Sequence, residues 1–131
     1  MNGGDVDCIA DTSIVIGLLR GNRETEQLAA GKNFAITYVT LAELSLGVLK
    51  SAKPEAAWQR IQEIIRDRLM FQVSPDTPVI YARIYFELEQ RGMMIPINDI
   101  WIAALAIETG LPILARDEHF SRIKGLKVIS C

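Results

Sequence analysis

The chain has 131 residues, half of them hydrophobic, and a formal net charge of -2. This length suits a single domain spanning residues 1–131 with one sizeable core. Because the net charge is slightly negative, any contact with RNA or DNA must come from a local basic patch. The two cysteines lack metal-ligand spacing, which argues against a zinc site. The sequence shows neither a signal peptide nor a membrane span, so we expect a soluble, cytoplasmic protein without membrane contact.

Short apolar runs alternate with helix-like segments, and Gly, Asn or Pro residues separate them. In chain order, the pattern predicts a strand over 7–10, helices over 12–20 and 24–30, a strand over 34–37, helices over 40–50 and 55–68, a strand over 69–73, helices over 74–91 and 99–109, and strands over 113–115 and 128–130. Strands that alternate with helices imply an α/β fold, with a mostly parallel sheet of four to five strands between helical layers.

Four acidic residues stand where predicted strands end or predicted helices begin. Asp11 and Asp117 directly follow strands, Glu43 follows a strand after a brief connection, and Asp99 opens the most apolar helix. In a parallel α/β sheet these points gather at one edge, and ligands bind there. The four carboxylates are therefore candidates for one site.

Each acid also has a purely structural explanation. Aspartate is favoured at helix starts, because its side chain accepts from free backbone N–H groups and meets the positive end of the helix dipole. The segment Thr40–Glu43 fits a capping box, in which the glutamate reaches back to the cap. Capping alone would leave the four acids apart.

The electrostatic repulsion among the four carboxylates helps to distinguish a shared site from separate helix caps. Two unit charges 4 Å apart repel by about 4 kcal/mol at an effective dielectric near 20. Either the acids lie apart as caps, or some are protonated, or a cation binds among them. A carboxylate site of this kind suits Mg²⁺ or Mn²⁺, and such ions activate water and neutralise phosphate oxygens. The pattern therefore favours phosphate chemistry.

Four segments resemble the PIN-domain ribonucleases of the VapC toxin type, and together they span nearly the whole chain. They are IADTS at 9–13, TLAEL at 40–44, IPINDIWIAA at 95–104 and LPILARDEHF at 111–120. The resemblance rests on the order and spacing of the segments. It implies a three-layer α/β/α sandwich, a metal-dependent endonuclease that cleaves RNA, a homodimer, and inhibition by a cognate antitoxin protein.

The resemblance also implies a role for each acid. By position, Asp11, Glu43, Asp99 and Asp117 match the acidic quartet around Mg²⁺ or Mn²⁺. Asp11, Asp99 and Asp117 are expected to hold the metal directly or through water, and Glu43 to orient or deprotonate the attacking water or to share a second cation. Thr12 or Ser13 matches a position at which a hydroxyl often supports the metal site in this family. Ala115 departs from the family, in which Thr or Asn often stands there, so one secondary polar contact is in doubt.

Other side chains allow two interpretations. Arg116 could meet a phosphate near the site or simply balance neighbouring acids. His119 is the only histidine, which excludes a ribonuclease with paired imidazoles, and it is expected to be a surface or packing residue. Trp101 is expected in the core, because base stacking needs exposure. Tyr81 and Tyr85 share a helix face and either pack internally or contribute to a dimer contact.

Trp58 lies on the amphipathic helix over 55–68, close in sequence to the leucine-rich segment over 39–49. The helix over 55–68 and the segment over 39–49 either form an apolar groove for an antitoxin helix or pack against the protein's own core. Two other functions compete with the nuclease. A haloacid-dehalogenase-like phosphatase would need a second Asp at position 13, where this chain has Ser13. A PIN fold kept as a binding or regulatory module without nuclease activity is the remaining alternative, although all four acids are present.

Overall fold

A parallel five-stranded sheet forms the centre of the protein, in a computed structural model that describes residues 5–130. The strand order is β3-β2-β1-β4-β5, and every neighbouring pair is parallel. The strands are β1 (Cys8–Ala10), β2 (Phe34–Thr37), β3 (Met70–Phe71), β4 (Ile113–Leu114) and β5 (Val128–Ile129). The predicted α/β fold with a parallel sheet is confirmed.

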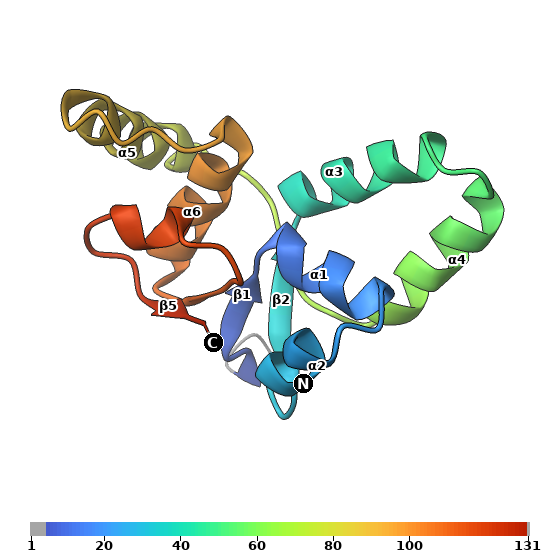
Figure 1. Cartoon of the computed structure of the whole chain (residues 1–131). Coiled ribbons are helices and arrows are strands. Elements are labelled where there is room, and N and C mark those ends of the chain that lie inside the picture. Colours follow the sequence, from blue (N-terminus) through green and yellow to red (C-terminus); the bar gives the residue numbers. More distant parts are fainter. Residues whose placement is uncertain (1–4, 131) are drawn as a thin grey trace.

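Helices cover both faces of this sheet (Figure 1). On one face lie α1 (Thr12–Leu19), α2 (Arg23–Ala29), α3 (Tyr38–Leu49) and α4 (Pro54–Ile65). On the other face lie α5 (Thr77–Gln90), α6 (Ile97–Thr109) and the short 3-10 helix η2 (His119–Arg122). The three layers are those of the expected α/β/α sandwich.

The alternation of side chains along the strands divides the core in two. Ile9 in β1 and Ile113 in β4 pack with α5 and α6. Cys8 and Ala10 point the other way and pack with residues of α1, α3 and α4, as does Phe34 in β2. Both faces of the central strands are buried, which explains why the sequences of these strands are continuous apolar runs.

The sheet has a switch point beside β1. From β1 the chain moves to β2 and β3 on one side, then returns to β4 on the other side of β1. Ligands of open parallel sheets bind outside the carboxyl ends of the strands at such a reversal. The backbone N–H of Asp11 donates to the carbonyl of Leu114 (2.8 Å), which ties the ends of β1 and β4 together. Residues just after these strands therefore meet at this edge.

The start of α3 differs from the prediction. The helix begins at Tyr38, and its N-cap is Thr37, whose hydroxyl accepts from the backbone N–H of Thr40 (3.1 Å). The capping-box explanation of Thr40 and Glu43 is therefore wrong. Because α3 begins earlier than expected, Glu43 lies in its second turn, where no free backbone N–H needs a cap.

Two other helices also begin elsewhere than predicted. Helix α6 begins at Ile97, so Asp99 lies in its first turn rather than at its start. Helix α5 begins at Thr77, after the Ser74–Pro75 pair that was expected to open it. Its Tyr81 stacks on Trp101 of α6, with ring centroids 4.0 Å apart. Trp101 is thus half-buried under Tyr81 and lies outside the two buried core clusters, so the expected core position is not met.

The thiol of Cys8 is fully buried in β1, and burial raises its pKa to about 11. Cys8 packs in the core beside α1, α3 and α4, and Cys131 lies outside the described residues. Across residues 5–130, no helix is both long and apolar enough to cross a membrane.

Candidate active site

Asp11 stands at the end of β1 and caps α1. Its side chain is 2% exposed. The Oδ2 atom accepts from the backbone N–H of Ser13 (3.2 Å) and from the Ser13 hydroxyl (2.8 Å). The Oδ1 atom is buried and has no hydrogen-bond partner among the described residues. One half of this carboxylate is thus held in place, and the other half is left without a partner.

The surroundings of Asp11 oppose its charge. Burial and, to a smaller extent, the negative charges of Asp99 and Asp117 raise its pKa to about 6, against the lowering effect of the hydrogen bonds from Ser13. Desolvation and like charges both disfavour an ionised carboxylate. A cation beside Oδ1 would stabilise the ionised carboxylate, offset this shift and supply the missing partner.

Glu43 is held in place by the first residue of α1. The Thr12 hydroxyl donates to Glu43 Oε1 (2.7 Å) and lies 2.9 Å from the Thr40 hydroxyl. A hydroxyl has one proton to give, so Thr12 must accept from Thr40 while it donates to Glu43. The two buried threonines therefore form a chain that fixes the carboxylate of Glu43.

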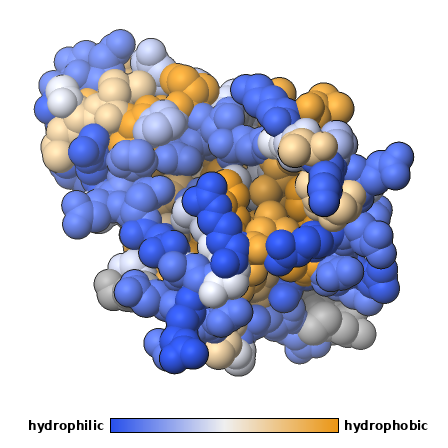
Figure 2. Space-filling view, turned by 45° about the vertical axis from the view of Figure 1, so that its right-hand side comes forward, coloured by the Kyte–Doolittle hydropathy of each residue, from blue (hydrophilic) through white to orange (hydrophobic). Residues whose placement is uncertain are grey.

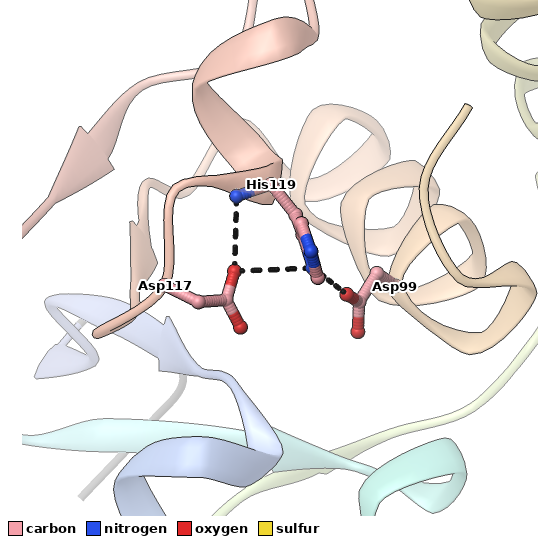
Figure 3. Close-up of side chains that lie close together, drawn as sticks. All are labelled: Asp99, Asp117 and His119. Atoms are coloured by element: carbon pink, nitrogen blue, oxygen red, sulfur yellow. Dashed lines mark hydrogen bonds and ion pairs between the residues drawn. The ribbon is translucent and has the colours of Figure 1, made fainter. Parts of the chain in front are cut away.

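Asp99 and Asp117 meet at the ring of His119 (Figure 3). His119 Nδ1 lies 3.1 Å from Asp99 Oδ2 and 3.4 Å from Asp117 Oδ1. The backbone N–H of His119 also donates to Asp117 Oδ1 (3.0 Å). The Asp99 side chain is 14% exposed, whereas those of Asp117 and His119 are 39% and 38% exposed. Both acids are thus open to a ligand at the surface of the protein.

The charges of neighbouring acids change the pKa values of Asp11 and Asp99, so the four acids lie near one another. Burial raises the pKa of Asp99, and the charges of Asp117 and Glu43 raise it further, while His119 lowers it. The charges of Asp99 and Asp117 likewise raise the pKa of Asp11. The four acids that the sequence singled out therefore lie near one another at the switch point, and one of them, Asp11, also caps α1.

The residues present fit a divalent cation. One ligand atom each from Asp99, Asp117 and His119 lies within 4.8 Å of the others. The buried, unpartnered Oδ1 of Asp11 supplies a further donor. Carboxylate oxygens are ligands that Mg²⁺ and Mn²⁺ prefer. Asp11, Asp99 and Asp117 could hold such an ion, and His119 stands beside them.

His119 is the residue that sequence reasoning missed. It was expected to be a surface or packing residue, yet its ring lies between two acids of the site. The available signal was its position two residues after Asp117, where a tight turn folds the chain back onto the acid. Its other partner, Asp99, is distant in sequence and comes close only in the folded chain.

The supporting positions differ in what they contribute. Ser13 holds Asp11, and its hydroxyl also accepts from the backbone N–H of Arg116 (3.5 Å). The Arg116 residue is exposed, which leaves its guanidinium in solvent at the rim of the site. Ala115 is fully buried and packs in the core under α6. At this departure from the family the chain supplies packing, and the Ser13 hydroxyl makes the nearby polar contact.

A hollow of about 380 Å³ opens between α1, α3 and α4. Figure 2 shows a hydrophobic area bordered by hydrophilic side chains on the face turned toward the reader. The residues that line the hollow are Ile16, Leu19, Arg20, Glu43, Leu44, Gly47, Val48, Ala57, Arg60 and Ile61. Trp58 follows the lining residue Ala57 on α4 and is 36% exposed, but it is not one of the lining residues. Glu43 belongs to both the hollow and the acidic site.

Comparison with known proteins gives consistent results. The family model of the PIN domain matches residues 8–126. The chain is 35% identical to ribonuclease VapC5 of Mycobacterium tuberculosis over 119 residues, 89% of this chain and 87% of the relative. It is 34% identical to ribonuclease VapC4 of the same organism over 93% of this chain and 95% of the relative.

Solved structures agree with these relatives. VapBC2 from Rickettsia felis, bound to a promoter DNA fragment, contains a chain with a TM-score of 0.85 and 27% identity, over 95% of this chain and 98% of that one. VapBC-5 from Mycobacterium tuberculosis, a member of the VapBC family of toxin-antitoxin systems, matches with a TM-score of 0.79 and 32% identity, over 96% of this chain and 99% of that one. The chain therefore belongs to the PIN-domain family.

Proposed function

We propose that this protein is a Mg²⁺- or Mn²⁺-dependent endoribonuclease that acts as the toxin of a toxin–antitoxin pair. The observation that carries the proposal is the buried Asp11 carboxylate, which leaves Oδ1 without a partner among neighbouring acids. The relatives named as VapC ribonucleases, and the VapBC complexes that share the fold, support the same conclusion.

The side chains divide the work of phosphodiester hydrolysis. Asp11, Asp99 and Asp117 would hold the divalent ion. When bound, the ion polarises the scissile phosphate and offsets negative charge in the transition state. Glu43, fixed by the Thr12 hydroxyl, orients the attacking water and accepts its proton. Ser13 keeps Asp11 in its rotamer through two hydrogen bonds.

RNA cleavage by purified variants tests this assignment. Asp11→Asn and Asp99→Asn keep the shape of the side chains but remove a metal-holding charge, so we expect cleavage in Mg²⁺ or Mn²⁺ to fall by at least about a hundredfold. Asp76→Asn, which changes an exposed acid at the start of α5, is the matched control and should cut at the parent's rate. Parental rates in both site variants would contradict the assignment.

Expression in living cells tests the toxin role separately. The parent chain expressed alone should arrest growth, and Asp11→Ala should relieve the arrest at an equal protein level. Mapping the ends of the cleaved RNA in arrested cells would identify the substrate. Arrest that persists in Asp11→Ala would assign the toxicity to something other than nuclease activity.

We place the antitoxin contact in the hollow between α1, α3 and α4. An amphipathic helix can lay its apolar face in such a groove. Because Glu43 lines the hollow and is also held in the acidic site, a segment bound there reaches the catalytic groups. Occupation of the hollow would therefore block the nuclease, as inhibition requires.

Variants of matched charge test the docking site. A Cβ added at Gly47 meets no atom within 4 Å, so Gly47→Arg fills the hollow without disturbing α3. Gln59→Arg adds the same charge to an exposed position outside the lining. Co-expression with the adjoining open reading frame should rescue growth for the parent and Gln59→Arg but not for Gly47→Arg. Trp58→Ala shows whether the contact extends past Ala57. Equal rescue of all variants would move the contact elsewhere.

We also propose a homodimer, formed through α5. Val79 and Phe86 of α5 are 53% and 62% exposed, and they line a shallow hollow with Pro78, Ala82 and Arg83. Tyr81 faces the other way, because its ring stacks on Trp101. Light scattering should give twice the chain mass for the parent and the single mass for Phe86→Glu. A dimeric Phe86→Glu would exclude this face.

A further inference from the structure

The ring of His119 is already in the position of a metal ligand. Its Nδ1 atom lies 3.1 Å from Asp99 Oδ2 and 3.4 Å from Asp117 Oδ1. Adjacent ligands of an octahedral ion with bonds near 2.1 Å stand about 3 Å apart. Nδ1 therefore stands at about the spacing of a neighbouring ligand from each carboxylate oxygen, and one ligand atom from each of the three residues lies within 4.8 Å of the others. Figure 3 shows the ring between the two acids.

The protein holds this ring in place. The backbone N–H of His119 donates to Asp117 Oδ1 (3.0 Å), which fixes the chain at the start of η2. The next residue, Phe120, is fully buried in the core formed with α6. Because η2 is anchored by Phe120 and by the bond to Asp117, the imidazole is directed toward Asp99 at little further entropic cost.

A second observation points to a cation at the same place. Asp11 Oδ1 is buried without a hydrogen-bond partner among the described residues, and the charges of Asp99 and Asp117 act on it. A carboxylate oxygen in that state needs either a donor or a cation. The ligand atoms within 4.8 Å of one another come from Asp99, Asp117 and His119, and the unpartnered oxygen of Asp11 lies within electrostatic reach of both of these acids.

We propose that His119 Nδ1 binds the divalent ion directly and makes this a mixed nitrogen–oxygen site that selects Mn²⁺ over Mg²⁺. The proposal rests on the metal-dependent function proposed above and names the ion. Mg²⁺ is a hard cation that takes oxygen ligands, whereas imidazole is a ligand of transition metals. Nδ1 binds through its lone pair, so the ring proton resides on Nε2 when the ion is bound.

Metal binding without RNA tests the ligand. Mn²⁺ and Mg²⁺ are titrated calorimetrically into the parent, His119→Gln, His119→Ala and the control Glu118→Gln, which alters an exposed neighbour. We expect His119→Gln to lose about tenfold or more in Mn²⁺ affinity and to change little in Mg²⁺ affinity. Glu118→Gln should retain the parent's preference for Mn²⁺. Circular dichroism of each variant confirms that it is folded.

Pulsed electron paramagnetic resonance of bound Mn²⁺ gives a direct readout. The parent and Glu118→Gln should show hyperfine coupling to a ¹⁴N nucleus, and both His119 variants should not. Mn²⁺ bound to the parent without nitrogen coupling, or bound more tightly by His119→Gln, would overturn the ligand while the metal-dependent nuclease stands. A parent that binds neither ion at millimolar concentration would overturn the metal-dependent function as well.

Discussion

Replacing Asp11 by asparagine should stabilise the metal-free protein while removing its activity. Burial and the neighbouring acids raise the Asp11 pKa from 3.8 to about 6. Each unit of pKa shift corresponds to about 1.4 kcal/mol, so the ionised carboxylate costs the folded state about 3 kcal/mol at neutral pH. Asparagine carries no charge, can accept the same two bonds from Ser13, and places its NH₂ group where Oδ1 has no partner.

The sign of the pH dependence follows from the raised pKa. Between about pH 4 and about pH 6, the folded parent keeps a proton on Asp11 that the unfolded chain has already lost. The free energy of unfolding of the parent therefore falls as pH rises through this window, and the full cost is present above about pH 6. The asparagine variant lacks this contribution, so the two proteins should differ little near pH 4 and most at neutral pH.

Urea unfolding with a chelator present measures the effect at both ends of the window. Adding Mn²⁺ at neutral pH should stabilise the parent by mass action but should have little effect on Asp11→Asn. Asp76→Asn, at an exposed position, should follow the parent throughout. A variant no more stable than the parent at neutral pH, or equally stabilised by Mn²⁺, would refute the reasoning about this carboxylate.

Three further changes test the packing and the polar chain around the site. Gly17→Ala should destabilise the fold by about 1–3 kcal/mol in urea unfolding, because its Cβ would stand 2.8 Å from Thr25 Cγ2, between α1 and α2. Gly47→Ala, where a Cβ meets no atom within 4 Å, should instead stabilise α3 by about 0.5–1 kcal/mol. Thr12→Val removes the hydroxyl that donates to Glu43, so it should lower kcat for RNA cleavage. The Mn²⁺ affinity, measured by calorimetry, should stay near the parent's. A large loss of Mn²⁺ affinity would show that Glu43 helps to hold the ion.

The layered fold was predictable because its signals are local. The residues of β1 and β2 are buried on both faces, so their apolar runs marked the strands, and the glycines after the helices marked the ends. The start of α3 was misplaced because two threonines, Thr37 and Thr40, both suit a cap. Sequence alone does not show that the first accepts from the backbone of the second.

Contacts between distant segments were harder to predict. Thr40 reaches Thr12, and His119 reaches Asp99, across separations that follow only from the strand order β3-β2-β1-β4-β5. The acids could be named in advance because each stands near a strand end or a helix start. The histidine could not, because its position two residues after Asp117 does not by itself distinguish a ring between two acids from one in solvent.

Capping and metal binding turn out to be compatible uses of one carboxylate. Asp11 Oδ2 caps α1 by accepting from Ser13, and Oδ1 stays without a partner among the described residues. Asp117 likewise accepts from the His119 backbone while its charge acts on Asp11. The bond to the backbone fixes the side chain, so the remaining oxygen is directed without further loss of side-chain entropy. An acid at a helix start is therefore well suited to a metal site, because the cap orients the ligand before the ion arrives.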